Sequence, residues 1–217
     1  MKSNNVLRNT HGFTLVELAI VLVIIGLIVA GVLKGRELIG NSKIKNVVQQ
    51  TKALEAAVHS YQNKFNALPG DDLTVTARYG TPPALQAAAK LNAFPAVADN
   101  GQVFNNLALA GMITGSYAAK TDYMQHKLGA EMYVLSLVAA TQITGAPANR
   151  IGNVIVLRNV TNEAAELIDR ELDDGLSNAG SLVAVPASPL TAALVPGTAA
   201  ATANYTTVQN LDLYYFF

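Results

Sequence analysis

The stretch that decides the fold is residues 12–33, Gly-Phe-Thr-Leu-Val-Glu-Leu-Ala-Ile-Val-Leu-Val-Ile-Ile-Gly-Leu-Ile-Val-Ala-Gly-Val-Leu. Among the 21 residues from 13 to 33, every side chain is apolar or small except Thr14 and Glu17. A helix of that length rises about 30 Å, which spans the hydrocarbon core of a bilayer. A carboxylate costs about 2.5–3.5 kcal/mol near the membrane centre, so acids in such a span are functional candidates. Glu17 is therefore the first candidate functional residue.

A short polar leader precedes this apolar run. It contains Lys2 and Arg8 and ends in Gly12, directly before Phe13 and the acid at Glu17. This start resembles that of a type IV prepilin or pseudopilin, including the glycine–phenylalanine junction. The resemblance implies that a membrane-bound prepilin peptidase cuts between Gly12 and Phe13 on the cytoplasmic side and then N-methylates Phe13. It also implies that Phe13 and Glu17 take part in assembly of a filament.

Two simpler interpretations compete with this resemblance. A secretory signal peptide usually has an apolar core of 7–15 residues and an A-x-A-like cleavage site. Here the run is longer, and only Val-Ala-Gly at residues 29–31 approaches such a site. A plain membrane anchor gives no reason for Glu17 or for the junction at Gly12 and Phe13. The prepilin interpretation accounts for all of these features.

The helical pattern continues beyond the apolar run. No proline occurs between residues 13 and 68, and Pro69-Gly70 is a strong helix stop. We therefore predict one helix of about 54 residues, or roughly 80 Å, with a transmembrane half at residues 13–33 and an amphipathic half at residues 34–68. The second half carries apolar or small side chains at three- and four-residue spacing, which should pack on the rest of the protein: Ile44, Val47, Val48, Thr51, Leu54, Val58, Tyr61 and Phe65.

Glycines punctuate this predicted helix at Gly26, Gly31 and Gly35. Each costs about 1 kcal/mol relative to alanine in a helix interior. They allow close packing of small residues between membrane helices. The resemblance suggests a second reading, in which this segment unwinds when subunits pack, although Lys34 stands where many pilins have a helix-breaking proline.

Residues 69–217 are predicted to form one α+β head in which an antiparallel sheet packs on the long helix, the pilin-like fold. Residues 186–203 are rich in alanine, threonine and proline and predict a low-complexity loop. Residues 205–217 are strand-like and end in Tyr-Tyr-Phe-Phe, which indicates either a buried last strand or an exposed contact surface. The other predicted elements are helices at residues 83–91, 103–113 and 162–172, the last capped by Thr161, and strands at residues 132–138, 153–157 and 181–185.

The sequence offers little for catalysis. Of the three histidines, His11 would leave with the leader, His59 lies on the predicted long helix, and His126 lies in a loop-like region. Nucleophile, phosphate-loop and zinc-protease motifs do not occur. There is no cysteine, which excludes disulfides and cysteine-based sites. The formal net charge is zero, which argues against nucleic-acid binding. We therefore predict neither an enzyme nor a cofactor.

One acidic cluster raises the question of calcium, because some pseudopilins bind Ca²⁺ in a loop of the head. Asp169, Asp173 and Asp174 are the candidate ligands. They do not follow the EF-hand pattern, since the glycine at Gly175 is displaced by one position and no glutamate closes the loop. Solvated acids at a helix end and turn are the preferred interpretation, and no metal site is predicted.

The resemblance therefore implies a filament subunit, of a type IV pilus or of a type II secretion pseudopilus, with its precursor in the bacterial inner membrane and its head outside the cytoplasm. The resemblance implies prepilin peptidase, copies of itself and related pilins, an assembly platform and the lipid bilayer as partners. The alternative is a singly anchored extracytoplasmic binding protein that does not polymerise. The positive-inside rule opposes the predicted topology, because basic residues after the span outnumber those before it: Lys34, Arg36, Lys43 and Lys45 against Lys2 and Arg8.

Overall fold

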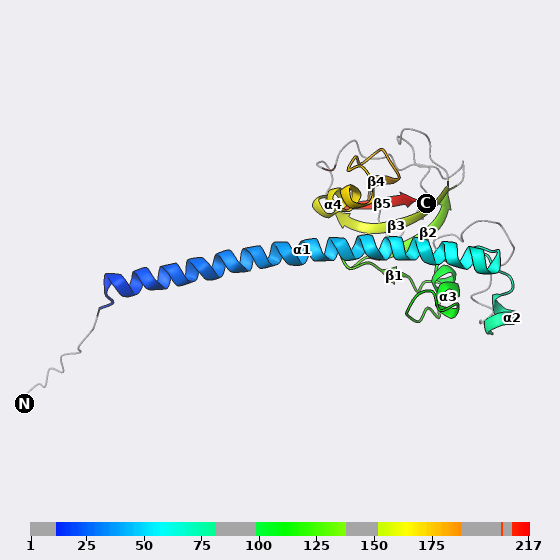
Figure 1. Ribbon diagram of the computed structural model, residues 1–217, viewed down its shortest axis with the longest axis horizontal. Coiled ribbons are helices and arrows are strands. Elements are labelled where there is room, and N and C mark those ends of the chain that lie inside the picture. The colour runs from blue at the N-terminus through cyan, green and yellow to red at the C-terminus, as the bar shows by residue number, and fades with distance from the viewer. Residues whose placement is uncertain (1–11, 81–98, 138–151, 188–204, 206–209) are drawn as a thin grey trace, which may run out of the picture. The chain divides into compact units, whose positions relative to one another are not determined.

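The computed structural model describes residues 12–80, 99–137, 152–187, 205 and 210–217 (Figure 1). The chain divides into two compact units, Met1–Ser42 and Lys43–Phe217. The elements are α1 (Leu15–Phe65), α2 (Val75–Tyr79), α3 (Gly101–Leu109), β1 (Met124–Gln125), β2 (Glu131–Leu137), β3 (Gly152–Thr161), α4 (Asn162–Leu172), β4 (Leu182–Pro186) and β5 (Asn210–Phe216).

Helix α1 has 51 residues, which confirms the prediction of one long helix. It ends at Phe65, a few residues before Pro69. Asn66 and Gly70 follow with positive φ values of 51° and 87°, and a residue in the left-handed region cannot continue the helix. The chain therefore turns between the end of α1 and Gly70.

The second unit is built around an antiparallel sheet with the strand order β1-β2-β3-β5-β4. The C-terminal strand β5 lies between β3 and β4, and its residues 211–214 are buried. The strand-like end of the sequence is thus an interior strand of the sheet. This agrees with the first of the two interpretations above, a buried last strand. Together with α1, the sheet gives the predicted α+β, pilin-like arrangement.

Several elements differ from their predicted bounds. Strand β3 is longer than its predicted range of residues 153–157, and α3 starts and ends earlier than its predicted range of residues 103–113. Helix α4, in contrast, begins and ends at the predicted residues. The sequence did not predict α2 or β1, because elements of 5 and 2 residues are too short to show a periodicity. The predicted helix at residues 83–91 and most of the predicted loop at residues 186–203 lie outside the described residues.

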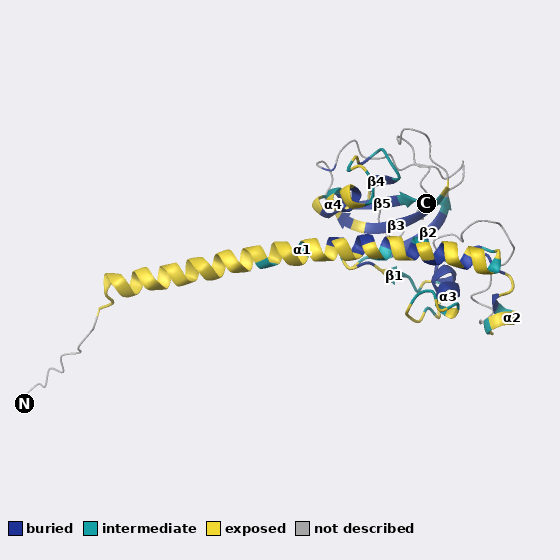
Figure 2. Cartoon of the chain, viewed as in Figure 1, coloured by how far each residue is buried: buried dark blue, intermediate teal, exposed yellow. Residues whose placement is uncertain are grey.

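Both faces of the sheet are buried. One face and the C-terminal half of α1 belong to a single core cluster, in which Leu54 is 1% exposed. Figure 2 shows buried positions along this half of α1 in dark blue. The opposite face forms a second cluster that includes Tyr133, Val154 and Tyr214. Because successive strand residues point to opposite faces, a strand buried on both sides needs an unbroken apolar run. This explains the sequence Val-Ile-Val-Leu at residues 154–157 of β3.

The edge of the sheet at β4 is closed. The Leu182 N–H donates to Asp173 Oδ2 at 3.0 Å, and the Ala184 N–H donates to the Ser177 carbonyl at 2.7 Å. The next residue on the same side is Pro186, which has no N–H to offer. The turn after α4 therefore blocks the pairing of another strand with β4.

Candidate processing and assembly site

The predicted cleavage junction lies just before helix α1. Gly12 and Phe13 precede the first helical residue, Leu15, and both are exposed. The Phe13 side chain is 82% exposed. No atom lies within 4 Å of the position that a Cβ at Gly12 would take. The peptide bond between Gly12 and Phe13 is therefore free of packing against the described part of the chain.

Thr14 and Glu17 cap the start of α1 reciprocally. The Thr14 N–H and hydroxyl donate to Glu17 Oε2 at 2.8 and 2.9 Å, and the Glu17 N–H donates to Thr14 Oγ1 at 3.2 Å. This is a capping box, which satisfies N–H groups that lack helical partners. The cap was not predicted above, although the spacing Thr-x-x-Glu just before an apolar run is the usual sequence signature of a capping box. Glu17 thus has a role within its own chain.

The surface of α1 after this cap is almost entirely apolar. Among the described helices, α1 alone is long and apolar enough to cross a membrane, and none of its apolar window is buried. Large apolar side chains from Leu15 to Leu33 are at least half exposed. Figure 2 colours this first part of α1 as exposed, in yellow. Exposed apolar surface on this scale requires lipid or protein to cover it.

The three glycines proposed as an unwinding segment, Gly26, Gly31 and Gly35, are helical in α1. At each one, no atom lies within 4 Å of the position that a Cβ would take. The described part of the chain therefore supplies no packing reason for a glycine. Lys34, between two of them, forms an exposed ion pair with Glu37 at 2.8 Å. Unwinding of this segment stays a prediction.

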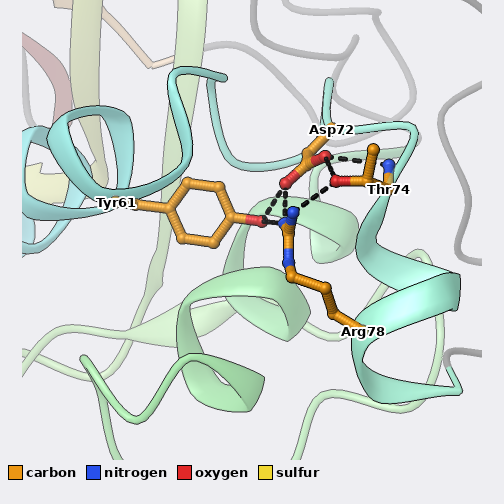
Figure 3. Close-up of polar contacts among 4 residues, drawn as sticks. All are labelled: Tyr61, Asp72, Thr74 and Arg78. Carbon is orange, nitrogen blue, oxygen red and sulfur yellow. Dashed lines mark hydrogen bonds and ion pairs between the residues drawn. The ribbon is translucent and has the colours of Figure 1, made fainter.

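A polar cluster lies at the other end of α1 (Figure 3). The Tyr61 hydroxyl donates to Asp72 Oδ2 at 2.8 Å, the N–H and hydroxyl of Thr74 donate to Asp72 Oδ1 at 2.9 and 2.8 Å, and the Arg78 guanidinium pairs with Asp72. Burial alone would raise the pKa of Asp72, but these hydrogen bonds hold it below its ordinary value. The cluster ties the turn after α1 to the helix, which is a structural role.

The histidines of the described part do not form a site. The His59 ring packs edge-on against Phe217 with the ring centroids 5.6 Å apart. His126 is buried, with Nε2 at 2.9 Å from the Arg158 carbonyl and Nδ1 accepting the Leu128 N–H at 3.2 Å. Burial lowers the pKa of His126, so it is a neutral core residue. The candidate metal ligands do converge: one carboxylate oxygen each from Asp169, Asp173 and Asp174 lies within 4.8 Å of the others.

In the comparison with protein families, residues 7–33 match the prokaryotic N-terminal methylation motif. No curated protein matches the chain. The matched residues include the junction at Gly12 and Phe13, the cap formed by Thr14 and Glu17, and the apolar start of α1. The motif points to a structural protein, and with the apolar helix it fits anchoring in the inner membrane. The chain thus carries, at residues 7–33, the leader signature of the type IV pilins and pseudopilins.

Proposed function

We propose that this protein is a structural subunit, a pilin or pseudopilin, of an extracytoplasmic helical filament. The observation that carries the proposal is the methylation motif at residues 7–33, placed at the start of a helix whose apolar surface is exposed. In this proposal the precursor sits in the bacterial inner membrane with its head outside the cytoplasm. Prepilin peptidase cuts after Gly12 and methylates the new N-terminus at Phe13. The mature subunit then joins its neighbours through the first half of α1.

This function gives each part of the chain a role. Residues 1–12 form the leader that is removed, residues 13–33 the membrane and assembly half of the helix, residues 34–68 its amphipathic half, and residues 69–217 the head. The partners are prepilin peptidase, copies of the chain and related pilins, an inner-membrane assembly platform, and the bilayer that holds the subunit before assembly. The filament is a type IV pilus or a type II secretion pseudopilus.

The processing step is tested by Gly12→Val. A larger side chain before the scissile bond should block the peptidase, so that full-length precursor accumulates in membranes. Mass spectrometry of the wild-type N-terminus should find N-methylated Phe13 and no leader. The matched control is Gly26→Val, the same change inside the span, which should be cleaved normally. Normal cleavage of Gly12→Val would contradict the proposal.

A second measurement distinguishes a subunit that polymerises from a singly anchored binding protein that does not. Cysteine-scanning crosslinks introduced along residues 15–33, on a chain that has no natural cysteine, should trap ladders of multimers in sheared filament fractions. An anchored monomer that is cleaved but gives no ladder and no filament fraction would favour the alternative.

A further inference from the structure

Basic side chains gather on α1 directly after its apolar run, at residues 34–45, here called the basic segment. It holds four lysines and arginines but only one acid, Glu37, which gives it a formal net charge of +3 in a chain whose net charge is zero. The next acid along α1 is Glu55. The four basic side chains are all exposed: Lys34, Arg36, Lys43 and Lys45.

Most of this positive charge has no partner within the protein. Lys34 forms the exposed ion pair with Glu37 at 2.8 Å, which uses the only acid of the basic segment. Arg36, Lys43 and Lys45 form no ion pair with any residue that the structure describes. Three positive charges of the basic segment are therefore available to an anionic partner outside the chain.

The positive charges surround α1 and do not line a single face. Successive residues of an α-helix are rotated by about 100° around its axis. Arg36 and Lys43 are two turns apart and share one face, whereas Lys45 lies on the opposite face, together with Lys34. A protein that docks on one face would meet only part of this charge. Lipid headgroups surround a membrane-spanning helix on every side, so they fit this distribution better.

The position along the helix also fits a membrane surface. The apolar run ends at Leu33, and a rise of about 1.5 Å per residue places Lys34 and Arg36 within about 5 Å of that end. The headgroup layer of one leaflet is roughly 5–8 Å thick, so both residues lie in this layer when the apolar run fills the hydrocarbon core. Lys43 and Lys45 lie about 15–18 Å beyond Leu33, roughly one Debye length above the layer.

We propose that the basic segment binds the phosphate groups of anionic phospholipids in the leaflet from which α1 leaves the membrane. Clusters of about 4–8 basic residues next to a membrane span attract anionic headgroups, and each such residue near the surface strengthens the attraction about fivefold. This binding gives the charges that oppose the predicted topology a partner on the outer side of the membrane. The proposal rests on the proposed function only in requiring α1 to cross the bilayer, and it needs neither cleavage nor polymerisation.

The test uses the full chain in vesicles of phosphatidylcholine that contain a minor fraction of phosphatidylglycerol. Val32→Trp introduces a single tryptophan near the end of the apolar run, at a position that is 51% exposed on a chain without tryptophan. Brominated acyl chains quench tryptophan on contact, so bromine on one lipid or the other reports which lipid surrounds the helix. Phosphatidylglycerol should be enriched about fivefold or more over its mole fraction in low salt. The enrichment should disappear in about 1 M salt, where the Debye length is about 3 Å.

A triple variant on the Val32→Trp background locates the effect. Replacing Arg36, Lys43 and Lys45 by glutamine removes the three charges that have no ion-pair partner among the described residues. The remaining charges of the basic segment, on Lys34 and Glu37, neutralise each other. The local concentration of phosphatidylglycerol should therefore fall to its mole fraction. All three positions are exposed, so the variant should fold normally.

The matched control makes the same change in net charge farther from the membrane. It replaces Lys52, Lys64 and Lys127 by glutamine, and all three are exposed. Lys52 and Lys64 lie on α1 roughly 28 Å or more beyond Leu33. Lys127 lies beside α1, because its N–H donates to Gln50 Oε1 at 3.2 Å. This control should keep the enrichment of phosphatidylglycerol.

Three results would overturn the proposal. The first is quenching of the Val32→Trp chain by the two lipids in proportion to their mole fractions, which would leave the membrane role of α1 intact. If the triple variant then failed to enter filaments, the partner of the basic segment would be an acidic surface of another copy. The second is an enrichment that survives in the triple variant. The third is no quenching by either lipid, which would also refute the membrane role in the proposed function.

Discussion

At the scale of single residues, Glu17 has two possible partners. Within its own chain the Thr14 cap uses only Oε2, and the carboxylate is exposed. An ionised carboxylate in a bilayer is costly unless a cation lies within reach. Cleavage would create such a cation, the amino group of Phe13. Within one helix the two groups meet only if the first turn frays, whereas in the proposed filament the amine of an incoming subunit would reach Glu17 of a neighbour.

We therefore expect Glu17→Ala to be inserted and cleaved but to enter filaments poorly. Its incorporation is measured in sheared filament fractions from a strain without the wild-type copy. Thr14→Ala is the matched control, because it removes the two hydrogen bonds of the Thr14 hydroxyl and keeps both the carboxylate and the hydrogen bond from the Thr14 N–H to Glu17. Equal losses in the two variants would mean that Glu17 acts only as a helix cap, and full assembly of Glu17→Ala would refute the intersubunit role.

The hydroxyl of Tyr61 is the second residue-scale case. It is fully buried and donates to Asp72, whose charge is held in place by Thr74 and Arg78. Tyr61→Phe removes the hydrogen bond donated to Asp72 and the longer one accepted from Arg78 at 3.3 Å, and it should lower the free energy of unfolding by about 1–3 kcal/mol. Tyr79→Phe, at a half-buried tyrosine nearby, should change it by less than about 0.5 kcal/mol. Urea denaturation followed by circular dichroism measures both, and equal effects would argue against the Asp72 bond as the cause.

At the scale of elements, the head depends on the apolar stripe of α1. The predicted stripe is confirmed: its members from Ile44 to Tyr61 are buried, and Phe65 is partly buried against the core. The sheet contributes the facing side of the same cluster. With no disulfide available, this packing supplies much of the stability of the second unit.

Leu54→Ala tests that packing. Leu54 is 1% exposed, so its truncation leaves a cavity and should lower the free energy of unfolding by roughly 2–5 kcal/mol. Lys52→Ala changes an exposed position of the same helix and should alter stability by less than about 0.5 kcal/mol. Denaturant midpoints of the two variants give the comparison. A loss of only a few tenths of a kcal/mol for Leu54→Ala would show that the stripe contributes little.

At the scale of the whole molecule, buried titratable groups shape stability against pH. The pKa of Asp169 is raised to about 6, from an ordinary value of 3.8. The folded state therefore binds more protons than the unfolded chain between about pH 4 and 6, and this group's contribution to stability falls as pH rises through that window. His126 acts in the opposite sense, because its lowered pKa makes protonation below about pH 6.5 favour unfolding.

The difference between Asp169→Asn and the wild type isolates the Asp169 contribution, because His126 is common to both. Asparagine resembles the protonated acid, so in excess chelator the variant should be more stable than the wild type at pH 7.5. The gain should shrink through pH 6 and vanish by about pH 4. Urea midpoints at a series of pH values measure it. A pH-independent difference would contradict the raised pKa.

The sequence by itself determined the elements whose signals are local. Residues 13–68 contain no proline and continue an apolar pattern, so a long helix follows from hydrogen-bond geometry and periodicity alone. Thr161 and the acids after it located α4, although the Thr161 side chain makes no capping hydrogen bond. The motif at residues 12–18 is equally local, since a peptidase reads a few adjacent residues. For that reason the order of those residues along the chain is enough to recognise it.

Only the tertiary structure decided which distant residues meet. The place of β5 between β3 and β4 depends on pairing between strands that are more than 20 residues apart in the chain. The sequence of an apolar strand does not specify which other strand it pairs with. The same holds for burial. In the sequence Asp169 is one acid among several at a helix end, and only the packing of Tyr205 against α4 shows that it is enclosed. The cost of a buried charge is set by its surroundings in space, which the order of residues along the chain does not contain.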